Sequence, residues 1–141
     1  MTRALVIHGT DLLVRGFLAA PPGLAAPDGS PTNALFAAAK ALRRALAFKL
    51  PDHAVAVFSA EPAKDWPPLV KAQHAGMRAL LEAHGFTVVE SARATDAAAA
   101  FVKGALDAGH DAMVVGYDKR LAQLVSDDVW FYDAYKDVRY T

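Results

Sequence analysis

The residues that could do chemistry stand directly after short apolar runs of the sequence. Two acids, Asp96 and Asp118, each have an arginine close by in the chain, Arg93 and Arg120 respectively. Carboxylates hold divalent cations or accept protons, whereas guanidinium groups bind phosphate bidentately or pair with carboxylates. Hydroxyl and imidazole groups complete the set, so the candidate site residues are His8, Ser59, Arg93, Thr95, Asp96, Asp118 and Arg120.

These residue types allow more than one interpretation. Asp96 and Asp118 can hold a divalent metal, but each also stands where a helix is expected to begin, and an acid there caps the helix or meets its positive dipole end. His8 can be a general base or a metal ligand, or a hydrogen-bonded residue at a strand end. Arg93, Arg120 and His8 can bind a phosphate, or the arginines can pair with the nearby acids. We expect the structural role in each case.

Apolar runs predict buried strands, and stretches with helical periodicity separate them. Strands are expected at 4–7, 54–58, 86–89, 112–115 and 129–131, and helices at 11–20, 32–49, 69–84, 95–108 and 119–125. Gly85 and Gly109 are expected to end two helices in the left-handed conformation. Continuous apolar strands that alternate with helices are typical of a parallel sheet covered on both faces. Ligands of such sheets bind beyond the carboxyl ends of the strands, where the candidate residues stand.

Length and composition limit the class of protein. The chain has 141 residues, no Cys, and 15 basic and 15 acidic residues. The length predicts one domain over residues 1–141. Without Cys there are no disulfides, no thiol catalysis and no Cys-ligated zinc, and in the absence of a signal peptide we expect a cytoplasmic location. No apolar run is long enough to cross a membrane, so we expect no membrane contact, and net neutrality argues against a strongly basic nucleic-acid binder.

Three segments carry a resemblance to a known family. Thr32-Asn33-Ala34-Leu35 opens the second helix, Asp118-Lys119 follows the fourth strand, and Gln123-Leu124-Val125-Ser126-Asp127 comes shortly after. Together with the strand ends they resemble the 5′-3′ exonuclease / flap endonuclease family over almost the whole chain. The resemblance implies a PIN-like three-layer α/β sandwich, with a mostly parallel five-stranded sheet and helices on both faces. It also implies contact with nucleic acid, for which the candidate residues are Arg15, Thr32, Asn33 and Lys119.

The acidic residues of that family are largely replaced in this chain. The family has Asp at the ends of the first and second strands, where this chain has His8 and Ser59. Its Glu-Ala-Asp-Asp motif reads Arg93-Ala94-Thr95-Asp96, and its Asp-Lys-Asp motif reads Asp118-Lys119-Arg120. The family is understood to use two divalent metal ions, and each ion needs several oxygen ligands. We therefore expect no metal or other cofactor; if nuclease activity remains, Asp96 and Asp118 are the candidate ligands for Mg²⁺ or Mn²⁺.

The resemblance also implies nucleic-acid-binding segments that are not expected here. Residues 61–68 stand where the family has a long basic and aromatic segment, and the chain stops at Thr141, before the family's helix–hairpin–helix region. If that region normally covers Trp130, Phe131 and Tyr132, these side chains form an apolar patch. The patch predicts a protein partner, or a homo-oligomer, through the C-terminal strand region.

We expect a catalytically inactive 5′-3′ exonuclease-like domain that acts by binding a protein or, weakly, nucleic acid. Two alternatives stay open. One is a divergent metal-dependent 5′-3′ exonuclease or flap endonuclease that uses Asp96, Asp118 and His8 around a metal ion. The other is a phosphate or nucleotide binder that uses Arg93, Arg120 and His8.

Overall fold

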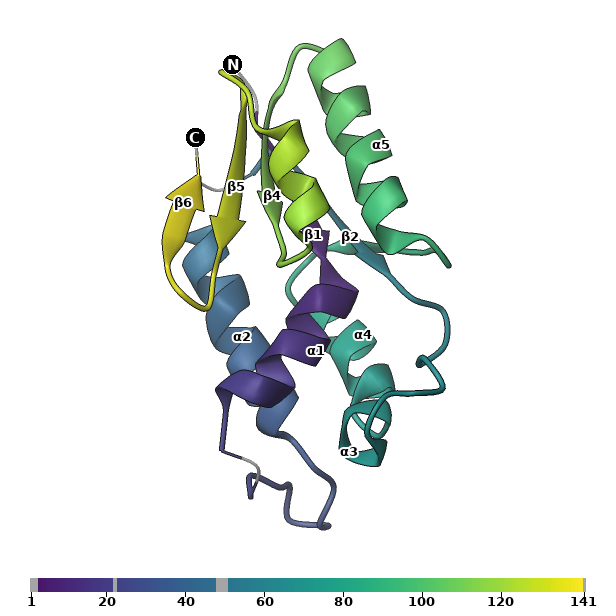
Figure 1. Ribbon diagram of the computed structural model, residues 1–141. Coiled ribbons are helices and arrows are strands. Elements are labelled where there is room, and N and C mark those ends of the chain that lie inside the picture. Colours follow the sequence, from purple (N-terminus) through teal and green to yellow (C-terminus); the bar gives the residue numbers. More distant parts are fainter. Residues whose placement is uncertain (1–2, 22, 48–50, 141) are drawn as a thin grey trace.

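The molecule has three layers, a six-stranded sheet between two layers of helices (Figure 1). The computed structural model describes residues 3–21, 23–47 and 51–140. The strands are β1 (Arg3–His8), β2 (His53–Phe58), β3 (Thr87–Glu90), β4 (Asp111–Val115), β5 (Val129–Asp133) and β6 (Val138–Tyr140). The helices are α1 (Gly9–Ala19), α2 (Asn33–Leu46), α3 (Pro68–Lys71), α4 (His74–Ala83), α5 (Ala94–Asp107) and the 3₁₀ helix η1 (Lys119–Leu124).

The strand order of the sheet is β3-β2-β1-β4-β5-β6, and all neighbours are parallel except β5 and β6. The predicted α/β sandwich with a mostly parallel sheet is confirmed. The sheet has six strands, however, and the prediction of five was wrong. The sixth strand was missed because its three residues are all exposed, so no apolar run marks it. Asp137, in the left-handed region at φ 56°, belongs to the turn between β5 and β6.

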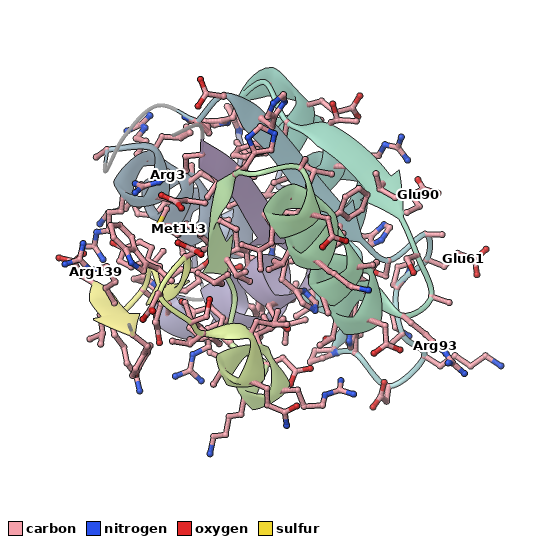
Figure 2. The ribbon with its side chains drawn as sticks, turned by 90° about the horizontal axis from the view of Figure 1, so that it is seen from above. Arg3, Glu61, Glu90, Arg93, Met113 and Arg139 are labelled. Carbon is pink, nitrogen blue, oxygen red and sulfur yellow. The ribbon has the colours of Figure 1, made fainter. Side chains whose placement is uncertain are left out.

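Alternate residues of the central strands enter two separate cores. In β1, Leu5 and Ile7 pack against the layer formed by α1, α2 and α4, whereas Val6 packs against α5 on the other face. The central strands follow the same rule, which explains why they are apolar at every position. Figure 2 shows Met113 of β4 inside the molecule, where it belongs to the first core. The two cores fix the register of the strands, and with it the relative positions of the strand ends.

Several helix boundaries differ from the sequence prediction. The single helix expected at 69–84 is two helices, α3 and α4, with Gln73 buried between them. The first helix begins at Gly9, because the His8 side chain caps it. The helix expected at 32–49 ends at Leu46, and residues 48–50 lie outside the described residues. Gly85 and Gly109 adopt φ values of 88° and 87°, as predicted for helix ends.

The Gln73 side chain explains the break between α3 and α4. Its Oε1 accepts hydrogen bonds from the backbone N–H groups of Ala34 and Leu35, at 2.9 and 3.1 Å. Its Nε2 donates to Asn33 Oδ1 at 2.8 Å and to the Leu69 carbonyl at 3.0 Å. Gln73 therefore caps α2 from another part of the chain, since Thr32 at the N-cap position makes no side-chain cap.

The predicted apolar patch at the C-terminal strand region does not form. Phe131 and Tyr132 are only 6% and 1% exposed. Trp130 is half-buried, and the guanidinium carbons of Arg3 and Arg139 lie 4.5 and 4.4 Å from its ring. Figure 2 shows both arginines on the same side of the molecule. The patch was wrongly predicted because strand β6, which pairs with β5, was not recognised in the sequence. None of the described helices has the length and apolarity to span a lipid bilayer.

Candidate site at the carboxyl edge of the sheet

The parallel strands bring most of the predicted site residues to one edge. His8 ends β1, Ser59 follows β2, and Thr95 lies in the first turn of α5. Together with Arg93, Asp96 and Arg120 they line a cavity of about 480 Å³, called the edge cavity below. Asp118 does not line it, but hydrogen-bonds to two residues that do. The other lining residues are Thr10, Asp11, Ser91, Ala92 and Ala94.

A chain of hydrogen bonds joins His8, Thr95 and Asp118. His8 Nδ1 accepts a hydrogen bond from the Asp11 backbone N–H at 3.2 Å, so the proton of a neutral ring is on Nε2. Nε2 then donates to Thr95 Oγ1 at 2.9 Å, and Thr95 donates to Asp118 Oδ2 at 2.7 Å. Burial lowers the pKa of His8, and this outweighs the nearby carboxylates of Asp11 and Asp118, which raise it. His8 is therefore a neutral residue with both ring nitrogens engaged.

The Arg120 side chain forms an ion pair with the Asp118 carboxylate. Arg120 Nε lies 3.1 Å from both carboxylate oxygens, and its Nη2 lies 2.7 Å from Oδ2. The backbone N–H of Arg120 also donates to Oδ1 at 3.0 Å, so Asp118 caps η1. The hydrogen bonds from Arg120 hold the pKa of Asp118 far below its usual range. Both carboxylate oxygens are thus taken by donors of the chain itself.

Asp11 is a site residue that the sequence analysis missed. Its Oδ2 accepts hydrogen bonds from the backbone N–H groups of Tyr117 and Asp118, both at 2.8 Å, which ties the end of β4 to α1. A Cβ at Gly116 would lie 3.1 Å from this oxygen, so the close approach depends on glycine. The available signal was an acid three residues after His8, and we interpreted that segment only as a helix start. With Asp11, three acids and two arginines stand at this edge.

The remaining edge residues are less engaged. The Ser59 backbone N–H donates to Thr10 Oγ1 at 2.9 Å, and its carbonyl accepts from His74 Nε2 at 2.8 Å. Ser59 Oγ is buried and has no hydrogen-bond partner among the described residues. Arg93 is exposed at the start of α5, as Figure 2 shows, and no ion pair engages its side chain in the described part of the chain. Asp96 lies in the first turn of α5 and is exposed.

The predicted nucleic-acid contacts fall in two places. Arg15 and Lys119 line a second cavity beside the β5–β6 hairpin. Thr32 and Asn33 lie at the start of α2, away from both cavities. Asn33 is completely buried, and its Nδ2 donates to the Phe17 carbonyl at 3.2 Å. Asn33 thus belongs to the buried network that caps α2, and its contact with nucleic acid stays a prediction.

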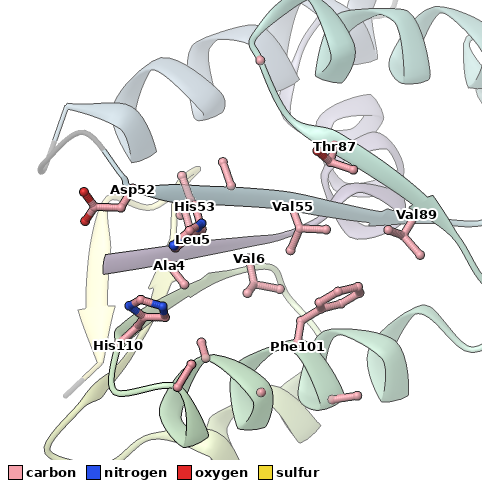
Figure 3. Close-up of a pocket in the computed structure, with 16 residues that line it drawn as sticks. Ala4, Leu5, Val6, Asp52, His53, Val55, Thr87, Val89, Phe101 and His110 are labelled. Atoms are coloured by element: carbon pink, nitrogen blue, oxygen red, sulfur yellow. The ribbon is translucent and has the colours of Figure 1, made fainter. Parts of the chain in front are cut away.

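A larger cavity, of about 640 Å³, lies away from this edge. It lies between α5 and strands β1 to β3, towards the amino ends of the strands (Figure 3). Figure 3 shows His53 and His110 at one end and Phe101 at the other, and the two imidazole rings are 4.8 Å apart. Small residues of α5 such as Gly104 leave this space open. Parallel sheets bind ligands at the opposite, carboxyl end, so this cavity is not the candidate site.

A three-layer sandwich with a polar site at the carboxyl edge of a mostly parallel sheet defines the class as a PIN-like α/β domain. The chain belongs to the 5′-3′ exonuclease family, because the family model described as "5′-3′ exonuclease, N-terminal resolvase-like domain" matches residues 3–141. The predicted family is confirmed. No curated protein sequence gives a significant match.

The fold is similar to that of the T5 D15 protein, whose structure was determined from crystals grown with metal ions. The TM-score is 0.62, the sequence identity is 12%, and the match covers 98% of this chain. The chain spans 56% of the length of that protein.

The residues at the carboxyl edge do not fit the two divalent ions that the family implies. Among the described residues, no group of three or more His, Asp or Glu side chains is arranged to hold a metal ion. Asp118 is occupied by Arg120 and Thr95, Asp11 Oδ2 accepts two backbone amides, and His8 has no free ring nitrogen. Mg²⁺ and Mn²⁺ would have to displace these donors to obtain their oxygen ligands.

Proposed function

We propose that this 5′-3′ exonuclease domain does not hydrolyse phosphodiesters and that it acts by binding. The observation that carries the proposal is the double hydrogen bond from Arg120 to the Asp118 carboxylate. A guanidinium group on a carboxylate supplies the positive charge that a metal ion would otherwise bring. A Mg²⁺ ion at this carboxylate would have to displace these hydrogen bonds and would be repelled by the guanidinium charge.

The hydrogen bonds around His8 support the same proposal. A metal ligand needs a free lone pair, and the Nδ1 lone pair of His8 already accepts from the Asp11 N–H. His8 could act as a general acid only in its protonated form, and its burial opposes that form. Two of the strand-end groups that could act in hydrolysis are therefore held in structural roles.

The proposal is tested with the purified chain on flap, nicked and single-stranded DNA in Mg²⁺ or Mn²⁺. We expect no metal-dependent cleavage, and no rise in the unfolding temperature when millimolar Mn²⁺ is added, because a ligand that does not bind the folded state does not stabilise it. Cleavage that is lost in Asp118→Asn would overturn the proposal.

A matched variant shows whether the replaced acids account for the missing activity. It restores the family's acidic pattern by five changes, His8→Asp, Ser59→Asp, Arg93→Glu, Thr95→Asp and Arg120→Asp. We expect this variant to be stabilised by Mn²⁺ where the natural chain is not, since several carboxylates then face one another and repel until a cation binds. Equal responses of the two chains to Mn²⁺ would show that the acids are not the cause.

A divergent metal-dependent nuclease is the second candidate, and Asp11 is the observation that favours it. With Asp96 and Asp118 it makes three acids near one edge, so the charge there is more favourable to a cation than two acids would make it. This candidate predicts Mn²⁺-dependent cleavage that Asp11→Asn reduces together with Asp118→Asn. We also propose a cytoplasmic location on the sequence features given above, which cell fractionation tests.

A further inference from the structure

The second cavity on the carboxyl side of the sheet has the features of a ligand site. It has a volume of about 460 Å³, within the range of about 300–1,000 Å³ usual for small-molecule pockets. It lies where β4 and β5 end, next to η1 and the β5–β6 hairpin, and it shares no lining residue with the edge cavity. We call it the hairpin pocket; its lining residues are Arg15, Gly116, Tyr117, Lys119, Ala122, Phe131, Asp133, Lys136 and Tyr140.

The charges of the hairpin pocket favour an anion. Arg15, Lys119 and Lys136 come from three different segments and are all exposed. No ion pair engages these side chains in residues 3–21, 23–47 and 51–140. The single acid of the lining, Asp133, is only 5% exposed, and its Oδ1 accepts the backbone N–H groups of Tyr135 and Lys136 at 3.0 Å each.

When cations and acids are compared in the same way, the edge cavity favours an anion less than the hairpin pocket does. Its two arginines stand near three acids, and one of them, Arg120, is already paired with Asp118. In the hairpin pocket three cations face one acid whose oxygen is turned to the backbone. Three exposed cations without an ion pair among the described residues therefore line this pocket on the carboxyl side of the sheet.

Aromatic rings line the hairpin pocket together with these cations. Tyr140 is 47% exposed, and its ring stands edge-on to Phe131 with centroids 5.7 Å apart. The Arg15 guanidinium carbon lies 5.3 Å from the Tyr117 ring centroid. Exposed aromatic rings among cations are the means by which proteins hold unpaired nucleotides, the base stacking on a ring and the phosphate meeting Lys or Arg.

We propose that the hairpin pocket binds one nucleotide unit, with its base on Tyr140 and its phosphate near Lys119 and Lys136. The inference rests on the proposed function, since it names the ligand of a domain that binds without cleaving. A free nucleotide and an unpaired residue of a single strand share this chemistry. An acidic protein segment would use the cations but has no base to stack on the ring.

The test measures binding of a fluorescein-labelled thymidine decanucleotide by anisotropy, in EDTA and over a series of salt concentrations. Lys136→Gln is compared with Lys103→Gln, since Lys103 is an exposed lysine on α5 that does not line this pocket. We expect Lys136→Gln to weaken binding at least five-fold and to reduce the slope of log K against log salt by about 0.7, the value for one phosphate contact with a single strand. Lys103→Gln should bind as the natural chain does.

The ring is tested by Tyr140→Leu and Tyr140→Phe. Leu should weaken binding at least five-fold and Phe should not, because stacking needs the ring and not the hydroxyl. Unfolding curves check that both variants fold, and Lys136→Gln tests the pocket independently of them. Competition with thymidine monophosphate separates the two sources: displacement at equal concentration identifies a free nucleotide, and displacement only at large excess identifies a strand.

Three results would overturn the inference. The first is no binding of the oligonucleotide at low salt, and the second is equal binding by all four variants. The third is poly-glutamate binding that is as tight as oligonucleotide binding and is unchanged in Tyr140→Leu. This third result would indicate a protein partner. The proposed function fails in a different way, if metal-dependent cleavage is found, and that assay is done without EDTA. The two failures can therefore be told apart.

Discussion

At the scale of single residues, one chain of hydrogen bonds joins several polar groups at the edge cavity. The Asp118 carboxylate accepts hydrogen bonds from Arg120 and Thr95. The Thr95 hydroxyl accepts one from His8, and the His8 ring caps α1. Each group in this chain orients the next, so the side chains are held in place without a bound ion. Other polar groups of the edge cavity are not part of this chain: the buried Ser59 Oγ has no partner among the described residues, and Arg93 and Asp96 are exposed.

The buried His8 gives a pH-dependent stability of definite sign. Its pKa in the folded chain is below the ordinary value of 6.5, so the unfolded chain binds more protons once the pH falls below about 6.5. Stability should therefore decrease with acidification in that range. Asp11, Asp118 and Arg120 are the charged groups that act on His8, and burial outweighs the two acids. Asn at position 8 can still offer an oxygen to the Asp11 N–H but cannot titrate.

Urea unfolding of the natural chain and His8→Asn between about pH 7.5 and pH 5 checks this. We expect the natural chain to lose stability relative to His8→Asn as the pH falls through this range. Comparison of the two chains removes the contribution of the other histidines. Parallel pH profiles would show that His8 does not titrate below its ordinary value.

Some site residues could be predicted from the sequence and others could not. His8, Ser59, Thr95 and Asp118 were predicted because each directly follows an apolar run or begins a helix. Asp11 was missed because its role depends on the end of β4, 106 residues away in the chain. Sequence spacing reports local geometry, and contacts of this kind depend on the packing of the whole sheet.

At the scale of elements, the start of α2 depends on a residue of a distant segment. Gln73→Ala removes the acceptor of the Ala34 and Leu35 amides and the donor to Asn33, all at buried or partly buried positions. We expect a loss of about 2–3 kcal/mol in unfolding free energy, because buried donors without partners retain their full desolvation cost.

Chemical denaturation measures this loss, with Gln123→Ala as the matched control. Gln123 is exposed on η1, so its replacement should change stability by less than about 0.5 kcal/mol. If both variants lose the same amount, the cap supplied by Gln73 does not stabilise α2.

The elements that could be predicted are those with a local signal. Apolar runs marked β1 to β5, and Gly85 and Gly109 marked helix ends. Strand β6 has no apolar run, and the break at Gln73 lies within a continuous helical pattern, so neither could be read from the sequence. Both are decided by tertiary hydrogen bonds, which override local propensity.

At the scale of the whole molecule, the two outer strands of the described sheet offer little for pairing with a second copy. The edge strands β3 and β6 have four and three residues, and short edge strands resist pairing with another sheet. Of the residues expected to form an apolar patch at the C-terminal strand region, Phe131 and Tyr132 are buried and Trp130 is half-buried. We therefore expect a monomer of 15.0 kDa in sedimentation equilibrium. A dimer that persists on dilution would show that another surface associates.

The position of Trp130 has an optical consequence. The chain has two tryptophans, and this one lies between an arginine of the first strand and an arginine of the last. Positive charge beside an indole alters its emission, so a Trp66→Phe chain would carry one fluorophore that senses the central strand β1 and the outer strand β6 at once. Stopped-flow fluorescence of that chain would time the moment in refolding at which β1 and β6 come together.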